Sequence, residues 1–154
     1  MKSAPWSVRL LALLLGFQSL GALFGGIFLV ASPSGEWMHM PLSMLDGSPF
    51  RSFLVPGLIL GIVLGIFPGF LAWAVIRRPA LRGAGLLNLY SGTHWAWAYS
   101  LYLGIMLVVW ILVEIIWVAY DPLQTVYGLV GVVVLILTLH PATMRYFGWK
   151  PEHG

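Results

Sequence analysis

Residues 52–76 read SFLVPGLILGIVLGIFPGFLAWAVI, a run of 25 positions without a charged side chain. A helix needs about 20 mostly apolar residues to cross a hydrocarbon core about 30 Å thick. The whole chain has 154 residues, of which 60% are hydrophobic and 8% charged, whereas soluble domains carry about 25% charged residues. The run therefore predicts a transmembrane helix, and the composition predicts an integral membrane protein.

Three further stretches also lack Asp, Glu, Lys and Arg, namely 10–35, 83–113 and 122–144. We expect helices near 8–31, 53–76, 92–120 and 123–141, with 32–52 as the longest loop. An open sheet would leave unpaired backbone groups in lipid, and none of these stretches alternates like a barrel strand. The predicted fold is all-α, a polytopic four-transmembrane-helix bundle that forms a single domain over 1–154.

The basic residues are distributed unequally between the two sides of this arrangement. Only Arg51 falls in the loop 32–52, and the other seven fall on the opposite side: Lys2, Arg9, Arg77, Arg78, Arg82, Arg145 and Lys150. Because Lys and Arg are retained on the cytoplasmic side, we expect both termini to lie inside the cell. The first apolar run is longer than the h-region of a signal peptide, so we expect it to remain as a span.

Glycines recur every four residues in the second predicted span. The row consists of Gly57, Gly61, Gly65 and Gly69, and a shorter version in the first span consists of Gly21 and Gly25. Small residues at this spacing let two helix backbones approach closely in lipid. We expect the first and second spans to cross at these glycines, with self-association through the same face as the alternative. Pro68 removes a backbone donor, so we also expect a kink in the second span.

Glu114 is the only acidic side chain inside a predicted span. Acids within a membrane are costly, usually face the bundle interior or a wet cavity, and are functional-site candidates. The candidate intramembrane polar site comprises Glu114, Asp121, Gln124, Arg51 and Gln18. Two interpretations stay open: a structural role, in which Glu114 pairs with Arg51 or Gln124, and a role as a proton or cation carrier.

Two histidines are placed where antiparallel helices would bring them to the same side. His94 begins the third span and His140 ends the fourth, a geometry that permits haem or metal ligation. Neither has an acidic ligand beside it in the sequence, so we expect no cofactor and no metal. The chain has no cysteine and no recognisable catalytic motif, and its basic residues are too few and too dispersed for nucleic acid. We expect no enzymatic activity.

Two segments carry a resemblance to known proteins: PFRSFLVPGLILGIVLG at 49–65, and HWAWAYSLYLGIMLVVWILVE at 94–114, followed by Gln124. Over spans two to four the chain resembles small, uncharacterised four-span integral membrane proteins of bacteria. The resemblance implies a multi-pass protein of the bacterial plasma (inner) membrane. It supplies no activity, ligand or catalytic residue.

Three functional hypotheses follow from the sequence. The first is a non-enzymatic membrane protein that packs with itself as a homo-oligomer, with a membrane-protein partner, or with lipid of the bilayer. The second is a small transporter or proton-coupled carrier that uses Glu114. The third is a protein that binds haem or quinone through His94 and His140.

Overall fold

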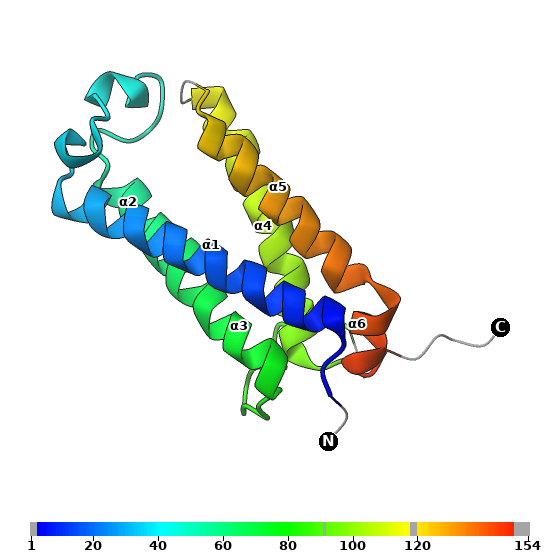
Figure 1. Ribbon diagram of the computed structural model, residues 1–154. Coiled ribbons are helices and arrows are strands. Elements are labelled where there is room, and N and C mark those ends of the chain that lie inside the picture. Colours follow the sequence, from blue (N-terminus) through cyan, green and yellow to red (C-terminus); the bar gives the residue numbers. More distant parts are fainter. Residues whose placement is uncertain (1–2, 91, 118–119, 150–154) are drawn as a thin grey trace.

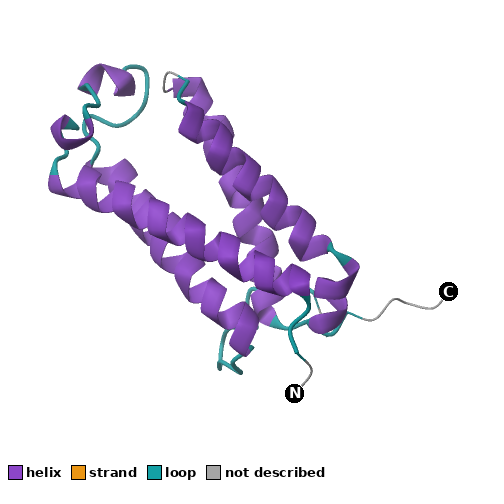
Figure 2. Ribbon diagram, in the orientation of Figure 1, coloured by secondary structure: helices purple, strands orange, loops and turns teal. Residues whose placement is uncertain are grey.

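The structure is a computed structural model that describes residues 3–90, 92–117 and 120–149. Over these ranges the chain is helical and contains no strand (Figure 2), which confirms the all-α prediction. Four helices are long and apolar enough to span a membrane, and each lies within a few residues of a predicted span: Trp6–Ala31, Leu54–Arg77, Trp95–Ile116 and Pro122–Leu139.

The elements follow one another in a simple order. They are α1 (Trp6–Ala31), the 3-10 turns η1 (Glu36–Met38) and η2 (Leu42–Leu45), α2 (Leu54–Gly61), the π-helical turn η3 (Ile62–Ile66), α3 (Phe67–Arg77), α4 (Trp95–Trp117), α5 (Pro122–Leu139) and α6 (Pro141–Tyr146). The segments α2, η3 and α3 run on as the single apolar helix Leu54–Arg77. The nine elements therefore form four long helices and three short ones.

The boundaries of the third and fourth helices differ from the prediction. The third helix starts at Trp95 rather than at 92, where Gly92 has a φ of +86°, and Tyr120 is not helical; residues 118–119 lie outside the described ranges. The fourth helix ends at Leu139 rather than at 141, because Pro141 disfavours helical geometry at the preceding His140, which has φ −62° and ψ 134°. Pro141 then opens α6, a helix that the sequence analysis did not predict.

The long helices form two hairpins. In one, α1 packs along α2, η3 and α3, and in the other α4 packs along α5 (Figure 1). The hairpins meet through contacts of α1 with α5 and of α3 with α4. The start of α1 and the helix α6 lie at one end of the bundle (Figure 1), which we call the termini end; the end with the segment 32–53 is the loop end.

The second span contains a π-helical turn between its two α-helical segments. Pro68 occupies the second position of α3, directly after the turn Ile62–Ile66. A proline cannot donate to the carbonyl four residues earlier, so the regular α-helical hydrogen-bond ladder cannot continue through it. A π turn is one of the ways in which a helix accommodates such a break.

The glycine row of the second span faces α1. A Cβ atom added at Gly26 would lie 2.6 Å from both Cα and N of Gly61, and one added at Gly57 would lie 2.8 Å from Cβ of Leu29. Further along the second span, a Cβ atom added at Gly65 would lie 3.0 Å from the Leu23 side chain. Only glycine permits backbones to come this close.

The remaining glycines of the predicted face divide between two partners. A Cβ at Gly69 would meet Oγ of Ser19 at 2.6 Å, and one at Gly25 would meet Leu60 at 3.0 Å, both across the crossing of α1 with the second span. Gly21 instead faces Tyr127 of α5. The prediction that Gly21 and Gly25 mark the crossing was therefore wrong for Gly21, and the closest approach is at Gly26, which the four-residue spacing did not include.

The loop 32–53 folds onto the end of the first hairpin. Leu45 and Phe53 are buried against Leu29 of α1 and form a second, small hydrophobic core. The backbone N–H of Phe53 donates to the carbonyl of Pro33 at 2.9 Å and closes the loop at its base. This packing accounts for the apolar character of a segment that would otherwise be too hydrophobic for solvent.

The glycine contact predicts an asymmetric response to alanine. Gly26→Ala places its methyl group against the backbone of Gly61, whereas a Cβ at Gly61 itself would lie 3.7 Å from Cα of Gly26, an ordinary contact distance. We expect Gly26→Ala to lower the free energy of unfolding by about 1–3 kcal/mol and Gly61→Ala to leave it unchanged or raised, as measured by thermal unfolding in detergent. Equal destabilisation by both variants would contradict the described crossing.

Candidate functional site

The termini end of the bundle is closed by core packing and by hydrogen bonds. Val8 and Leu11 of α1 and Leu71 of α3 are fully buried there. Nε1 of Trp97 donates to the carbonyl of Thr138 at 2.8 Å and joins α4 to α5. Because lipid offers no hydrophobic driving force for helix association, polar contacts of this kind carry much of the specificity.

The short helix α6 ties both hairpins together at the same end. Oγ1 of Thr143 donates to Oγ of Ser7 on α1 at 2.8 Å, and both side chains are buried. The N–H of His94, just before α4, donates to the carbonyl of Phe147 at 2.9 Å. The α6 region thus contacts the first residues of α1 and of α4, which fixes the hairpins relative to each other.

Burial decreases steadily toward the loop end along one face of α5. Val134 on this face is 0% exposed, Tyr127 two turns further is half-buried, and Leu123 one turn beyond is 60% exposed. The spacing of seven and four residues keeps the three side chains on the same side of the helix. The hairpins therefore separate beyond Tyr127, as the ribbon shows (Figure 1).

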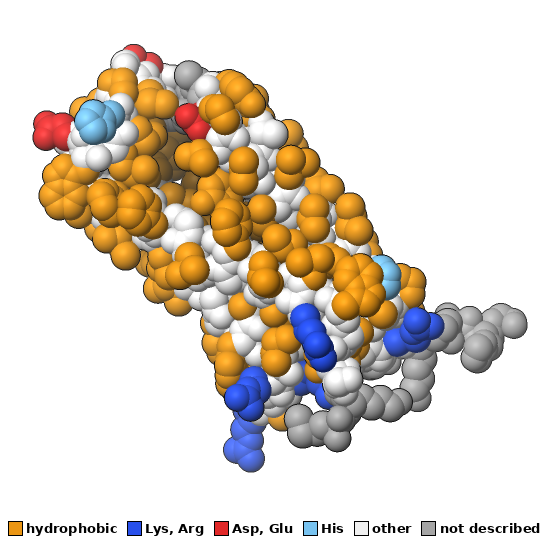
Figure 3. Space-filling view, viewed as in Figure 1, with side chains coloured by type: hydrophobic (Ala, Val, Ile, Leu, Met, Phe, Trp, Pro, Cys, Tyr) orange, Lys and Arg blue, Asp and Glu red, His pale blue; other side chains and the backbone are white. Residues whose placement is uncertain are grey.

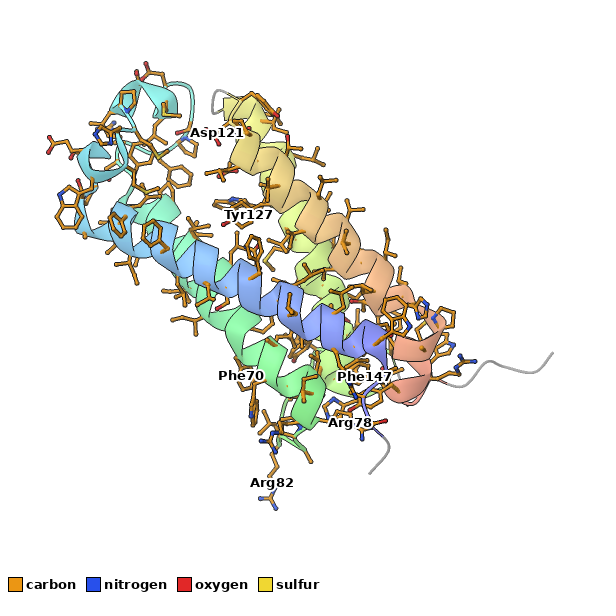
Figure 4. The ribbon with its side chains drawn as sticks, viewed as in Figure 1. Phe70, Arg78, Arg82, Asp121, Tyr127 and Phe147 are labelled. Carbon is orange, nitrogen blue, oxygen red and sulfur yellow. The ribbon has the colours of Figure 1, made fainter. Side chains whose placement is uncertain are left out.

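We call the space between α1 and α5 on the loop side of Tyr127 the wedge. Figure 3 shows the molecule hollowed here, between the loop 32–53 and the nearby end of α5. Tyr127 forms the floor of the wedge, since it reaches across to α1, lies over Gly21 and stacks on Phe17 with ring centroids 6.2 Å apart (Figure 4). Tyr127 was not predicted as a functional residue; the sequence signal available for it is that it is the only aromatic residue of α5.

Aromatic side chains continue from this floor along α1 to the loop. The rings of Phe24 and Phe28 lie 4.4 Å apart, and Phe28 meets Trp37 of η1 edge-on at 6.0 Å. Phe28 falls on the face of α1 that Tyr127 contacts, by helical spacing. A helix rises about 1.5 Å per residue, so the wedge extends about 15 Å along α1, from Gly21 to Ala31, and about 8 Å along α5, from Tyr127 to Pro122.

The predicted polar site is only partly brought together. The carboxylate of Asp121 accepts from the N–H of Leu123 at 2.8 Å, and the side-chain oxygen of Gln124 accepts from the N–H of Asp121 at 3.3 Å. These reciprocal bonds form a capping box at the start of α5. Asp121 and Gln124 thus have a structural role at the rim of the wedge.

The other predicted members lie on separate elements. Glu114 is half-buried in the last described turn of α4, and Arg51 is exposed in the segment before α2. Gln18 is buried in the middle of α1, away from the α4–α5 connection. The hydrogen bonds of Gln124 and Asp121 are made within the cap, so the hypothesis that Gln124 pairs with Glu114 has no contact in the structure to support it.

Gln18 is linked to the proline of the second span. Its Nε2 donates to the carbonyl of Leu64 at 3.4 Å, a long hydrogen bond. Leu64 lies four residues before Pro68, so this is the carbonyl that the proline leaves without an α-helical donor. Transmembrane helices tolerate prolines where a neighbouring helix supplies the missing donor. Oε1 of Gln18 is buried and has no hydrogen-bond partner among the described residues.

The two histidines serve different local structures. Nδ1 of His94 accepts from the N–H of Ala96, and Nδ1 of His140 accepts from the N–H of Ala142, each at 3.2 Å. His94 lies beside Phe147, whereas His140 packs edge-on against Trp6. Burial lowers the pKa of His94, which precedes the span Trp95–Ile116. In the described part of the chain, no group of three or more His, Cys, Asp or Glu side chains is arranged to hold a metal ion.

Comparison with known proteins adds no further assignment. The chain matches no family model, no curated protein and no solved structure. Functional inference therefore depends on the geometry of the bundle.

The bond from Gln18 to Leu64 predicts coupling between Gln18 and Pro68. In a Pro68→Ala background the alanine N–H can bond the Leu64 carbonyl, so the amide of Gln18 becomes dispensable. We expect Gln18→Leu to lower the free energy of unfolding by about 1 kcal/mol more in the protein with Pro68 than in the Pro68→Ala variant. This difference is within the range of interhelical hydrogen bonds in membranes. A double-mutant cycle on unfolding free energies measures this difference. An equal cost of Gln18→Leu in both backgrounds would show that the two residues are independent.

Proposed function

We propose that the chain is a non-enzymatic, multi-pass protein of a bacterial plasma membrane, and that it associates with lipid or a membrane partner through the wedge. The observation that carries this proposal is the gradient of burial along α5, from 0% exposure at Val134 to 60% at Leu123. A helix face that is core at one end and uncovered at the other leaves room for a second molecule. Four apolar helices of spanning length support the placement in a membrane.

The distribution of charge supports an orientation with both termini in the cytoplasm. Among the described residues, the arginines at the termini end are Arg9, Arg77, Arg78, Arg82 and Arg145 (Figure 3), whereas Arg51 lies in the loop at the other end. Basic residues are retained on the cytoplasmic side. In this orientation the wedge opens toward the outer leaflet.

The dimensions of the wedge favour the acyl chain of a lipid as its occupant. A hydrocarbon core of about 30 Å gives each leaflet about 15 Å, similar to the length of α1 beyond Gly21. A partner helix that spans the whole membrane would meet the closed half of the bundle, where α1 contacts α5 and α3 contacts α4. An acyl chain needs only one leaflet, and the aromatic pair Phe24 and Phe28 offers it an apolar wall.

A matched pair of variants tests this proposal. Leu123 and Leu129 of α5 are 60% and 59% exposed, but a spacing of six residues places them on different sides of the helix. We expect native mass spectrometry of the protein, released gently from its membrane, to show a bound lipid on the wild type and on Leu129→Trp. Leu123→Trp should lose that lipid, because the indole fills the wedge.

Three results would overturn the proposal in different ways. Loss of the bound lipid from both variants would mean that the retained lipid does not occupy the wedge. A bound protein in place of a lipid would replace the acyl chain as the occupant. A wild-type protein that carries neither lipid nor protein would contradict the proposed association. The carrier hypothesis would then be tested by measuring whether Glu114→Gln abolishes a proton flux in vesicles.

A further inference from the structure

A basic pocket lies at the termini end of the bundle, whereas the wedge lies at the loop end. Its volume is about 380 Å³, and its charged and polar walls are Arg77, Arg78, Arg145 and His94. The first two residues come from the end of α3, Arg145 comes from α6, and His94 precedes α4. The three arginines are exposed, so their guanidinium groups are accessible from solution.

Arg78 is held in place before any ligand binds. Its Nη1 donates to the carbonyl of Tyr146 at 3.1 Å, and its guanidinium carbon lies 4.2 Å from the centre of the Tyr146 ring. The backbone of Arg78 is left-handed, with a φ of +48°, a conformation that costs free energy in a residue other than glycine. The same conformation ends α3, because Arg78 is its C-cap residue, so the position of Arg78 is fixed by the backbone as well as by Tyr146.

Among the described residues, no acidic side chain lines this pocket. The acidic residues of the described part are Glu36 and Asp46 in the loop, Asp121 at the start of α5 and Glu114 near the end of α4. The acidic side chains visible in Figure 3 lie toward the loop end. The pocket therefore presents a concentrated positive charge, while the bonds to Tyr146 use only part of the five N–H donors of Arg78.

We propose that this pocket binds a phosphate group, through Arg77, Arg78 and Arg145. Guanidinium groups bind phosphate with paired N–H donors and keep their charge at all physiological pH values. The pocket lies at the end of the spans Leu54–Arg77 and Trp95–Ile116, the level at which lipid headgroups are found. Phosphate of an anionic lipid and free inorganic phosphate share this chemistry, and the experiment separates them.

The test compares two double variants with the same loss of charge. Arg77→Gln with Arg145→Gln removes two walls of the pocket, whereas Arg9→Gln with Arg82→Gln removes two exposed arginines from the same end that do not line it. The protein is reconstituted in nanodiscs of phosphatidylcholine containing a small fraction of phosphatidylglycerol, and bound lipids are counted by native mass spectrometry. We expect affinity for phosphatidylglycerol to fall about fivefold per pocket arginine, about 25-fold for the pair, and to change little in the control.

A second arm identifies the source of the phosphate. Inorganic phosphate is titrated into the protein in nanodiscs of pure phosphatidylcholine, and binding is followed by the ³¹P linewidth. Saturable broadening that the pocket variant abolishes assigns free phosphate as a ligand, whereas its absence together with lipid binding assigns the headgroup. The proposal would be overturned if the pocket and control variants lost the same amount of affinity for phosphatidylglycerol. It would also be overturned if the wild type bound neither phosphatidylglycerol nor inorganic phosphate. Wild-type thermal unfolding of both variants excludes misfolding as the cause.

The inference rests on the proposed placement of the chain in a membrane, and the two fail in different ways. A chain that does not reconstitute into nanodiscs would contradict that placement. A reconstituted chain that binds no phosphate would contradict only the site.

Discussion

The contact of Gly26 with Gly61 is the constraint on which the rest of the bundle depends. It brings the backbones of α1 and the second span together so closely that no Cβ fits at Gly26, and the contacts of Gly57 and Gly65 extend it in both directions. In a bilayer, where burial of apolar side chains offers little driving force, such close backbone approach favours helix association. Because the glycine row is covered by α1, it does not offer a free face for self-association.

The same physics explains why the bundle is closed at one end and open at the other. Helices in lipid gain little by burying apolar side chains against each other, so closure depends on small residues and hydrogen bonds. Between the hairpins the buried bond of Thr143 to Ser7 lies at the termini end, and the contact of Tyr127 with Gly21 lies further along. In a bilayer, exposed apolar side chains beyond Tyr127, such as Phe24 and Leu123, would face lipid without cost.

Much of the fold could be predicted from the sequence, because a bilayer sets the length and polarity of a spanning helix. The four spans appear as charge-free runs, and Pro68 marks the interruption of the second one. The helix α6 was not predicted, since Pro141 indicates where α5 ends but not that a new helix follows. The closest crossing was placed at Gly21 and Gly25 rather than Gly26, because a four-residue spacing defines a face and not its register against a neighbour.

The candidate site was less predictable, since it depends on tertiary packing. Sequence proximity grouped Gln124 and Asp121 with Glu114, yet the first two form a helix cap. Gln18 was assigned to the candidate polar site from the sequence, whereas its partner, the carbonyl of Leu64, could be identified only from the structure. The wedge depends on how exposure changes along α5, and composition does not encode that change.

The central claim is that the hairpins are separated on the loop side of Tyr127 when the protein is in a bilayer. The chain has no cysteine, so single spin labels can be attached after Leu123→Cys, Val134→Cys and Leu129→Cys, and their collision rates with oxygen can be compared in lipid. The account predicts high accessibility at 123, close to that of the lipid-facing reference at 129, and low accessibility at 134. Low accessibility at both 123 and 134 would show a bundle that is closed along its length and would contradict the account.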